Sequence, residues 1–466
     1  MNITKKELFY SLLFTMFLIT YMAVLSVTDS IANGLSDEFA LPMLHYLPGF
    51  TRIVGFISFG FSRRLIKSTN KRYILLIFTG MIFLVSSTVM ALVSSSAVLP
   101  FVFLLSLSLG YTGGLIYYCL SIALTVSVYK GRLLGICCAL SVLIQLIMQN
   151  LIKSYTQSAL AAFLIVLLII IYIKAPSDYI LEDPLPFASE DENFDKTIIK
   201  QLAVICLIIF IMTLMACHTD ISFLNLSFAG NINIYSYPRL FMILGYVTLG
   251  FIVDIKGIKV FTSAFFCGIL ISFVLVLMPF ANDGFNMFLS VYYLFISIYI
   301  FFYTYSFMSL APRTSFPELW AAGGRPISEL LTCIITFLMM KASIHNNLSP
   351  LIYCVFYIIM TIALYVMLTS IYKDPYPESK IKETPDVSSS VVSSVNIFDN
   401  YCLTPREKEV AAMLIESDLS MKAIALEMNI SERSLYRYSS SIYEKTGAQN
   451  RPGLIKLLVT GTVNKL

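Results

Sequence analysis

The sequence predicts an all-α protein in which a twelve-helix transmembrane bundle precedes a small soluble helical domain. Of the 466 residues, 58% are hydrophobic and 13% are charged, whereas about a quarter of the residues in soluble domains are charged. The mean hydropathy is +0.80. Apolar runs of about 20 residues, the length that crosses a bilayer, recur up to residue 372, and short amphipathic segments replace them beyond residue 400.

Twelve apolar runs are long enough to span a membrane. We expect spanning helices at 8–28, 39–61, 73–93, 98–127, 133–152, 156–173, 198–217, 234–253, 258–279, 287–310, 326–343 and 348–371. The loops on the side of the two termini then hold sixteen lysines and arginines, and the opposite loops hold only Lys153 and Lys341. Because positive loops stay inside, this asymmetry predicts a multi-pass protein of the bacterial inner (cytoplasmic) membrane with both termini cytoplasmic.

Composition divides the chain into five parts. An acidic loop with three prolines, 174–197, separates a first six-helix half, 1–173, from a second, 198–372. A stretch rich in Ser, Pro and charge, 373–400, is typical of a flexible linker. It leads to the C-terminal domain, 401–466.

Polar landmarks recur in the two membrane halves at nearly constant spacing. The pairs are Asp29 and Asp220, Arg52 and Arg239, and Arg132 and Arg325, with offsets of 191, 187 and 193 residues. Such a recurrence predicts a parallel repeat of six helices, a 6+6 arrangement.

The loop between the eighth and ninth spans carries the sequence GFIVDIKGIK, from Gly250 to Lys259. With the repeat, it makes residues 1–372 resemble the major facilitator superfamily, whose G-x-x-x-D-[RK]-x-G-[RK] loop latches the cytoplasmic gate. The loop after the second span, around Arg64, keeps basic charge but has no Asp. The resemblance therefore argues less for a full transport cycle. The alternative for the loop at Asp254 is a plain positive-inside turn.

Arg52 and Arg239 are the strongest candidates for a site within the membrane. An arginine at the middle of a bilayer costs several kcal/mol unless it is paired or solvated. We expect Arg52 and Arg239, with Asp29 and Asp220 at the outer ends of their spans, to form a pocket for a small anionic ligand. The nitrate/nitrite porters look similar in having one Arg from the second helix of each half. The alternative is structural: each Arg pairs with a neighbouring Asp or with helix carbonyls. His45, His218 and Glu329 are further polar candidates.

Capping signals divide the C-terminal domain into four helices. Thr404, Pro405 and Glu407 form a capping box that opens the first helix. Ser420 caps a second, short helix, and a third runs over 432–446 until Gly447. A fourth is expected at 451–460. The predicted inward residues are Val410, Met413, Leu414, Ile424, Met428, Leu435, Tyr438 and Ile442.

Two short helices joined by a tight turn, the second with a basic outer face, are typical of a helix-turn-helix. The domain resembles the LuxR-type (GerE-like) DNA-binding domain in Leu403–Glu407, Glu409–Val410, Ser420, Lys422, Ile424–Ala425, Ile430–Ser431, Lys445, Gly447 and Asn450–Arg451. This resemblance implies that the third helix enters the major groove of double-stranded DNA and that the fourth forms a homodimer. It also implies base contacts by Ser434, Tyr436, Arg437 and Ser440, and phosphate contacts by Lys422, Ser431, Arg433 and Lys445.

Tyr436 stands where the family commonly has Lys, so the guanine contact falls to Arg437. From Asn400 onward nine Lys/Arg stand against seven Asp/Glu, a net charge of +2. This charge gives modest attraction to DNA per copy, so useful affinity needs a dimer.

The membrane bundle and the C-terminal domain together predict a membrane-embedded one-component transcriptional regulator, whose bundle senses a small molecule or a membrane signal. No nucleophile–base set, Gly-rich phosphate loop, or metal- or cofactor-binding motif is present, so we expect no enzyme activity, metal or cofactor. One alternative is a major-facilitator-type transporter with a regulatory C-terminal domain. Another is an adaptor whose C-terminal domain binds protein.

Overall fold

A computed structural model describes most of the membrane part and the centre of the C-terminal domain. The described residues are 3–34, 47–92, 96–125, 127–152, 154–175, 192–228, 232–234, 236–257, 285–314, 316–343, 359–360, 362–363, 365–366, 403–416, 421, 424–425, 428, 432–446, 448 and 454. Every regular element in these ranges is a helix, which confirms the all-α prediction. The chain divides into two compact units, Met1–Asp374 and Pro375–Leu466.

Six long helices overlap the first six predicted spans. They are α1 (Lys5–Gly34), α3 (Pro48–Leu65), α4 (Thr69–Leu92), α5 (Leu99–Ala123), α6 (Lys130–Leu151) and α7 (Ser154–Ile173). A short 3-10 turn, η1 (Ser96–Val98), leads into α5. The helix α1 opens with a capping box, because the backbone N–H of Thr4 donates to Glu7 at 2.7 Å and that of Glu7 donates to the Thr4 hydroxyl at 3.2 Å.

The later part of the membrane unit contains four further long helices. They are α8 (Glu192–Phe228), α9 (Leu240–Lys256), α11 (Phe285–Leu310) and α13 (Gly324–Ser343), with the short elements η3 (Tyr237–Arg239), η6 (Ala311–Arg313) and α12 (Pro317–Trp320) between them. The helix α8 begins inside the predicted central loop, since its polar first turns extend the apolar span toward the N-terminus.

The spans predicted at 258–279 and 348–371 fall wholly or largely outside the described residues. Eight described helices are long and apolar enough to cross a membrane, judged by length and composition. The helix α3 is not among them, and its 18 residues include three arginines. The total of twelve spans therefore stays a prediction.

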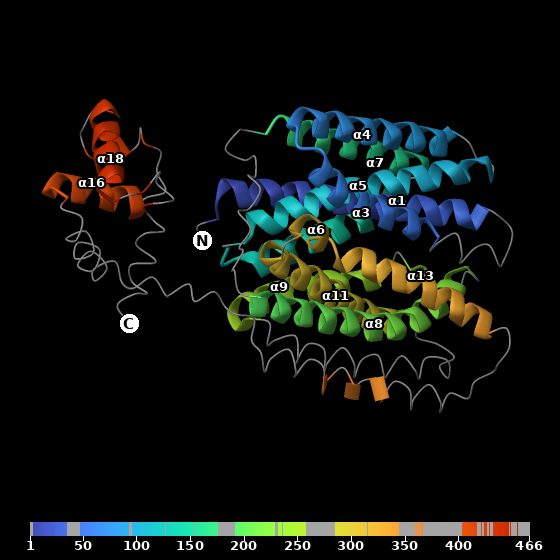
Figure 1. Ribbon diagram of the computed structural model, residues 1–466. Helices are drawn as coiled ribbons and strands as arrows, with labels where there is room; N and C mark the ends of the chain where they lie inside the picture. The colour runs from blue at the N-terminus through green and yellow to red at the C-terminus, as the bar shows by residue number, and fades with distance from the viewer. Residues whose placement is uncertain are drawn as a thin grey trace. The chain divides into compact units, whose positions relative to one another are not determined.

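Contacts between the two predicted halves follow a regular pattern (Figure 1). The helix α3 packs against α5 within the first half and against α13 of the second, and α6 packs against α9. The helices α4 and α7 pair with each other, and α1 packs against α5, α6 and α7. The second and fifth helices of the first half therefore make the main contacts with the second half.

Glycine brings α3 and α5 backbone to backbone. A Cβ atom added at Gly110 on α5 would lie 2.0 Å from the carbonyl oxygen of Arg52, and one at Gly55 on α3 would lie 2.2 Å from that of Leu107. Only residues without a side chain permit such an approach. The position of Arg52 is thus set by main-chain packing as well as by its side-chain partners.

The C-terminal unit contains α16 (Pro405–Glu416) and α18 (Glu432–Thr446). The capping box is confirmed: the backbone N–H of Thr404 donates to Glu407 Oε2 at 2.8 Å, and that of Glu407 donates to Thr404 Oγ1 at 3.3 Å. The third predicted helix is confirmed with its bounds. Most of the second and fourth predicted helices lies outside the described residues.

Apolar side chains of this unit form one core. Val410, Leu414, Ile424, Leu435 and Ile442 are fully buried, and Met413, Met428 and Tyr438 pack against them. All eight inward residues expected from the sequence therefore belong to the core or contact it. Leu454, from the predicted fourth helix, is also buried.

Candidate functional site

A cluster of charged side chains lies buried in the membrane unit and centres on Glu329 of α13. Its carboxylate accepts hydrogen bonds from Arg52 Nε at 2.9 Å, Arg325 Nε at 3.0 Å and the Tyr21 hydroxyl at 2.6 Å. Arg325 and Glu329 are four residues apart on one helix, the spacing that places side chains on the same face. The cluster thereby joins α1, α3 and α13.

Aromatic rings surround the two guanidinium groups. Arg325 donates a hydrogen bond to the Tyr303 hydroxyl of α11 at 2.7 Å. Its guanidinium carbon lies 4.3 Å from the centre of the Tyr21 ring, and that of Arg52 lies 4.8 Å from the same centre. Both distances are in the range of favourable cation–π contact.

The cluster carries a net charge of +1. Arginine is always protonated in proteins, and a carboxylate between two guanidinium groups is held ionised. The described contacts of Arg52, Arg325 and Glu329 include no second carboxylate. Two positive charges therefore share one negative charge, with side chains only 5%, 16% and 11% exposed, respectively.

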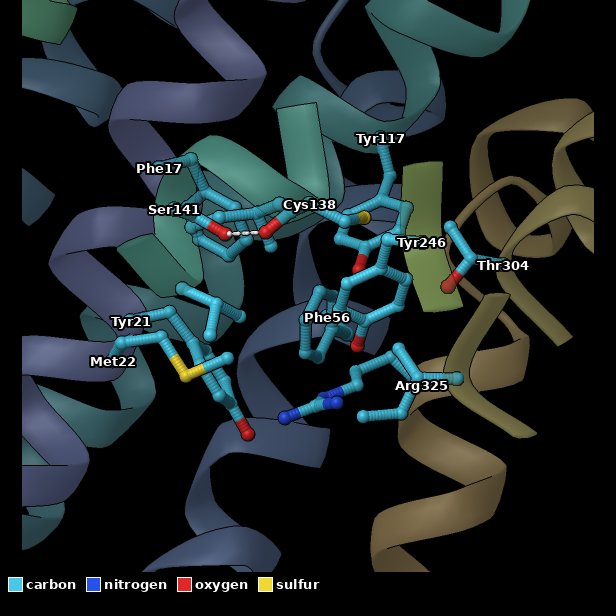
Figure 2. Close-up of a pocket in the computed structure, with 13 residues that line it drawn as sticks. Phe17, Tyr21, Met22, Phe56, Tyr117, Cys138, Ser141, Tyr246, Thr304 and Arg325 are labelled. Carbon is cyan, nitrogen blue, oxygen red and sulfur yellow. Dashed lines mark hydrogen bonds between the residues drawn. The ribbon is translucent and has the colours of Figure 1, made fainter. Parts of the chain in front are cut away.

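A small cavity adjoins the cluster at Arg325 (Figure 2). It offers about 20 Å³ to the centres of water molecules, and α1, α3, α5, α6, α9, α11 and α13 all contribute to its wall. Figure 2 shows the rings of Phe56, Tyr117 and Tyr246 grouped beside the Arg325 side chain, with Tyr21 below them. The wall residues come from both predicted halves, so the cavity lies between them.

Arg239 occupies a different setting from Arg52. It lies inside the predicted eighth span, in the 3-10 turn η3 at the start of the candidate span Tyr237–Lys256. Pro238 favours this position, because it lacks the N–H that a helix interior requires. Arg239 donates to the carbonyl of Ile234 at 3.1 Å and to the side-chain oxygen of Gln145, and its guanidinium lies 5.5 Å from the Tyr293 ring.

Three of the four residues expected to form the membrane site lie around one tyrosine: Arg239, Asp220 and Asp29 all act electrostatically on Tyr293. Asp220 on α8 also accepts a hydrogen bond from the Tyr292 hydroxyl at 3.1 Å, and Asp29 is buried near the end of α1. The fourth residue, Arg52, is held by Glu329. Arg239 donates to a backbone carbonyl, as the structural alternative expects, whereas the partner of Arg52 is a glutamate and not an Asp.

Sequence reasoning missed Arg325 as a site residue and gave Glu329 no partner. Arg325 entered only as a landmark of the repeat, and Tyr21 did not enter at all. One signal was present in the sequence: Arg325 and Glu329 are four residues apart at the start of a predicted span, which is ion-pair spacing in an apolar helix.

The predicted loop motif makes a direct contact between the halves. The Asp254 carboxylate, at the end of α9, accepts hydrogen bonds from the backbone N–H groups of Gly131 at 2.6 Å and Arg132 at 2.9 Å, at the start of α6. The Arg132 side chain also lies 3.5 Å from it. A carboxylate at a helix N-terminus accepts hydrogen bonds from the free N–H groups and is attracted to the positive end of the helix dipole.

The C-terminal end of α3, which corresponds to the end of α9 at Asp254, is also bound to the other half, but here the loop supplies a basic residue. Arg64 forms an ion pair with Glu318 of α12, and its guanidinium lies 3.7 Å from the Phe316 ring. The loop without an Asp is therefore tied to the other half by a basic residue instead.

The predicted DNA-reading helix, α18, is strongly amphipathic. Tyr436, Arg437 and Ser440 are exposed, and Tyr436 keeps 56% of its surface. Leu435 and Ile442 are fully buried on the other side. Ser434 is half-buried, and the Arg437 guanidinium lies 5.9 Å from the Tyr438 ring. The base-contact candidates thus include three side chains that are open to solvent.

The phosphate candidates are placed less uniformly. The Lys445 Nζ donates to Glu407 Oε2 at 2.7 Å, and the Ser441 hydroxyl donates to Glu407 Oε1 at 2.7 Å. The Lys445 and Ser441 hydrogen bonds hold the pKa of Glu407 at about 2. Lys445 is therefore engaged within the domain. Lys422 and Ser431 lie outside the described residues, as does the side chain of Arg433.

A scan of family models identifies the C-terminal unit. Residues 401–458 match the family described as "Bacterial regulatory proteins, luxR family". No curated protein matches the chain.

Solved structures resemble the membrane unit in fold. The crystal structure of the human organic anion transporter MFSD10 (TETRAN) matches with a TM-score of 0.53 at 10% identity, over 78% of this chain and 100% of that one. The crystal structure of a mutant of the nucleoside transporter NupG has a TM-score of 0.49 at 14% identity, with the same coverage. The chain therefore joins a helical bundle that shares its fold with the MFSD10 crystal structure to a LuxR-type DNA-binding domain at residues 401–458.

Proposed function

We propose that the protein is a membrane-embedded one-component transcriptional regulator. In this proposal the bundle senses a small molecule and thereby controls sequence-specific DNA binding by the C-terminal domain. The match of residues 401–458 to the luxR family carries the proposal. The exposed Tyr436, Arg437 and Ser440 on α18 support it, because they provide a polar face that a major groove can accept.

The proposal includes twelve spans in a 6+6 arrangement, with both termini on the cytoplasmic side of a bacterial inner membrane. Two pairs of helix contacts support the repeat. The contact of α3 with α13 joins the second predicted span to the eleventh, and that of α6 with α9 joins the fifth to the eighth. A two-fold relation between the halves converts each pair into the other. The excess of Lys and Arg on the side of the termini supports the orientation.

DNA binding is proposed to need a homodimer. With a net charge of +2 and Lys445 paired to Glu407, one copy of the domain has only a modest electrostatic attraction to phosphate. Two copies double the number of phosphate and base contacts and so raise the affinity for double-stranded DNA.

A gel-shift experiment tests the DNA-binding step. The full chain in lipid nanodiscs is titrated onto the promoter region of its own gene. We expect Arg437→Ala to weaken the specific shift by about tenfold or more, because a bidentate arginine–guanine contact contributes about 1–3 kcal/mol.

Arg406→Ala is the matched control, because Arg406 is an exposed arginine on α16 that pairs with Glu409. It should keep the specific shift. A full-strength shift by Arg437→Ala would refute the assigned face of α18, and the absence of any specific shift by the wild type would refute the proposed function.

A further inference from the structure

We propose that the cavity beside Arg325 is the sensory site and that its ligand is a small aromatic monocarboxylate. The inference rests on the proposed regulatory function and names the class of its ligand. It moves the predicted anion site from the pair Arg52 and Arg239 to the cluster of Arg52, Arg325 and Glu329.

The charge of the cluster selects an anion. Two arginines and one glutamate leave one positive charge in surroundings where the three side chains are at most 16% exposed. A buried charge without a counterion is unfavourable, and the bilayer supplies no water to solvate it. A ligand with a single negative charge would neutralise the cluster, whereas a dianion would reverse its sign.

The position of Arg325 makes it the contact residue. Arg325 is a charged member of the cavity wall, and it is linked through Glu329 to Arg52. A guanidinium group with its Nε committed to Glu329 still presents its two terminal nitrogens, of which one donates to Tyr303. A carboxylate is the small anion that matches this planar edge and can carry an organic body into the rest of the cavity.

The remaining wall favours an aromatic body. Phe17, Phe56, Tyr117 and Tyr246 are buried members of the wall. Tyr117 lies 6.0 Å from Phe17 and 6.2 Å from Phe56, ring centre to ring centre, with both pairs edge to face. An aromatic ring can continue this edge-to-face arrangement, which contributes beyond simple area burial. The hydroxyls of Ser141 and Thr304, also in the wall, can orient a polar substituent.

The size of the cavity links occupancy to helix movement. About 20 Å³ of space for water centres holds roughly one water molecule, which is far less than a benzene ring requires. The ligand therefore favours an arrangement in which the wall helices stand further apart. Because α1, α3, α5 and α6 face α9, α11 and α13 across the cavity, this expansion separates the halves, and a ligand that binds the expanded form shifts the population toward it.

Direct binding to the full chain in nanodiscs tests the site. The probes are benzoate and 3-phenylpropanoate, with benzamide as the uncharged isostere and cyclohexanecarboxylate as the non-aromatic one, measured by calorimetry. We expect at least one aromatic carboxylate to bind and both isosteres to bind about tenfold or more weakly. Binding by neither aromatic carboxylate, or equal binding of benzamide, would overturn the inference.

Two variants with opposite expected effects on affinity distinguish loss of the contact from misfolding of the protein. Arg325→Met removes the contact and should lower the affinity for the aromatic carboxylate about tenfold or more. Glu329→Gln raises the cluster charge to +2 and should increase that affinity. Arg239→Met distinguishes the two arginine sites and should stay within about twofold of wild type. Loss of binding in Arg239→Met with retention in Arg325→Met would place the site elsewhere. Arg325→Lys keeps the charge and should retain part of the affinity.

A gel shift with and without benzoate, on the same nanodiscs, separates this inference from the proposed function. Binding that depends on Arg325 without any change in the DNA shift would uphold the site and refute its regulatory role. A specific DNA shift with no aromatic carboxylate bound would uphold DNA binding and refute the site.

Discussion

At the residue scale, one carboxylate holds together the two described helices of the DNA-binding domain. Glu407 completes the capping box of α16 through Thr404, and it also accepts hydrogen bonds from Ser441 and Lys445 of α18. Its side chain is 7% exposed, so these contacts are largely shielded from solvent. The residue that completes the cap of α16 therefore also binds the C-terminal part of α18.

The stability of this domain should fall in acid through Glu407. The hydrogen bonds hold its pKa at about 2, below the ordinary value of about 4.3. A depressed carboxylate stabilises the folded state above the ordinary pKa, and that stabilisation is lost as the pH falls from about 4.3 toward 2. Hydrogen exchange of the α18 amides in the full chain, corrected for intrinsic rates, should show less protection at pH 3 than at pH 5.

Glu407→Gln removes the titrating group and serves as the comparison. Protection in this variant should be low at both pH values and nearly independent of pH between them. If the variant keeps the acid sensitivity of the wild type, other carboxylates account for that sensitivity.

At the scale of elements, the ends of three long helices and the short helix α12 are tied across the halves by two contacts, one through an acidic and one through a basic residue of the loop. Asp254 of α9 caps α6, whereas Arg64 of α3 pairs with Glu318 of α12. From the sequence, the loop at Arg64 was expected to lack the family's latch because it has no Asp. The structure differs because the acid stands on the opposing element, where a motif search of the loop does not find it.

Weakening the Asp254 cap should loosen this end of the bundle. Asp254→Asn removes the negative charge that interacts favourably with the α6 dipole and should destabilise the contact of α9 with α6 by about 1 kcal/mol. Spin labels at positions 67 and 256 should then show a shift of the distance distribution toward longer values. Asp220→Asn, whose residue contacts Tyr292 on another part of the bundle, should leave that distribution unchanged, and an unchanged distribution in Asp254→Asn would show that the cap does not hold the halves.

Local patterns predicted the elements well, and they predicted the pairing of elements poorly. Apolar run length located α5 and α11, and capping chemistry located α16 and α18 with its bounds, because both depend on neighbours in sequence. The partners of Arg52 depend on how α3 meets α13, which no local pattern reports. The repeat predicted similar roles for Arg52 and Arg239, but their partners differ. Arg52 pairs with a glutamate, whereas Arg239 donates to a side-chain amide oxygen and to a backbone carbonyl. Arg239 lies at the start of its span, where Pro238 favours the beginning of a helix.

At the scale of the whole molecule, the proposed mechanism requires the linker 373–400 to convey the state of the bundle to the DNA-binding domain. Along the sequence, the first compact unit ends at residue 374, and the luxR family match begins at residue 401. A ligand changes DNA binding only by the difference between its affinities for two arrangements of the bundle. The connection between the units is therefore as necessary as the site.

Cutting the linker should abolish control without abolishing DNA binding. With a protease site inserted between residues 385 and 386, the uncut chain in nanodiscs should show a DNA shift that responds to benzoate. After cleavage, the released domain should bind the same DNA regardless of benzoate. A shift that still responds after cleavage would mean that the signal does not pass through the covalent connection.

The close approach of Gly110 to Arg52 has a mechanical consequence. Since the α5 backbone lies directly against the α3 backbone at this arginine, the two helices have no intervening side chains to deform and should move as a single rigid lever. Glu329 of α13 is attached to that lever through Arg52. An occupant of the cavity that displaces α3 from α13 should therefore move α5 together with α3 and pull against the ion pair of Arg52 with Glu329.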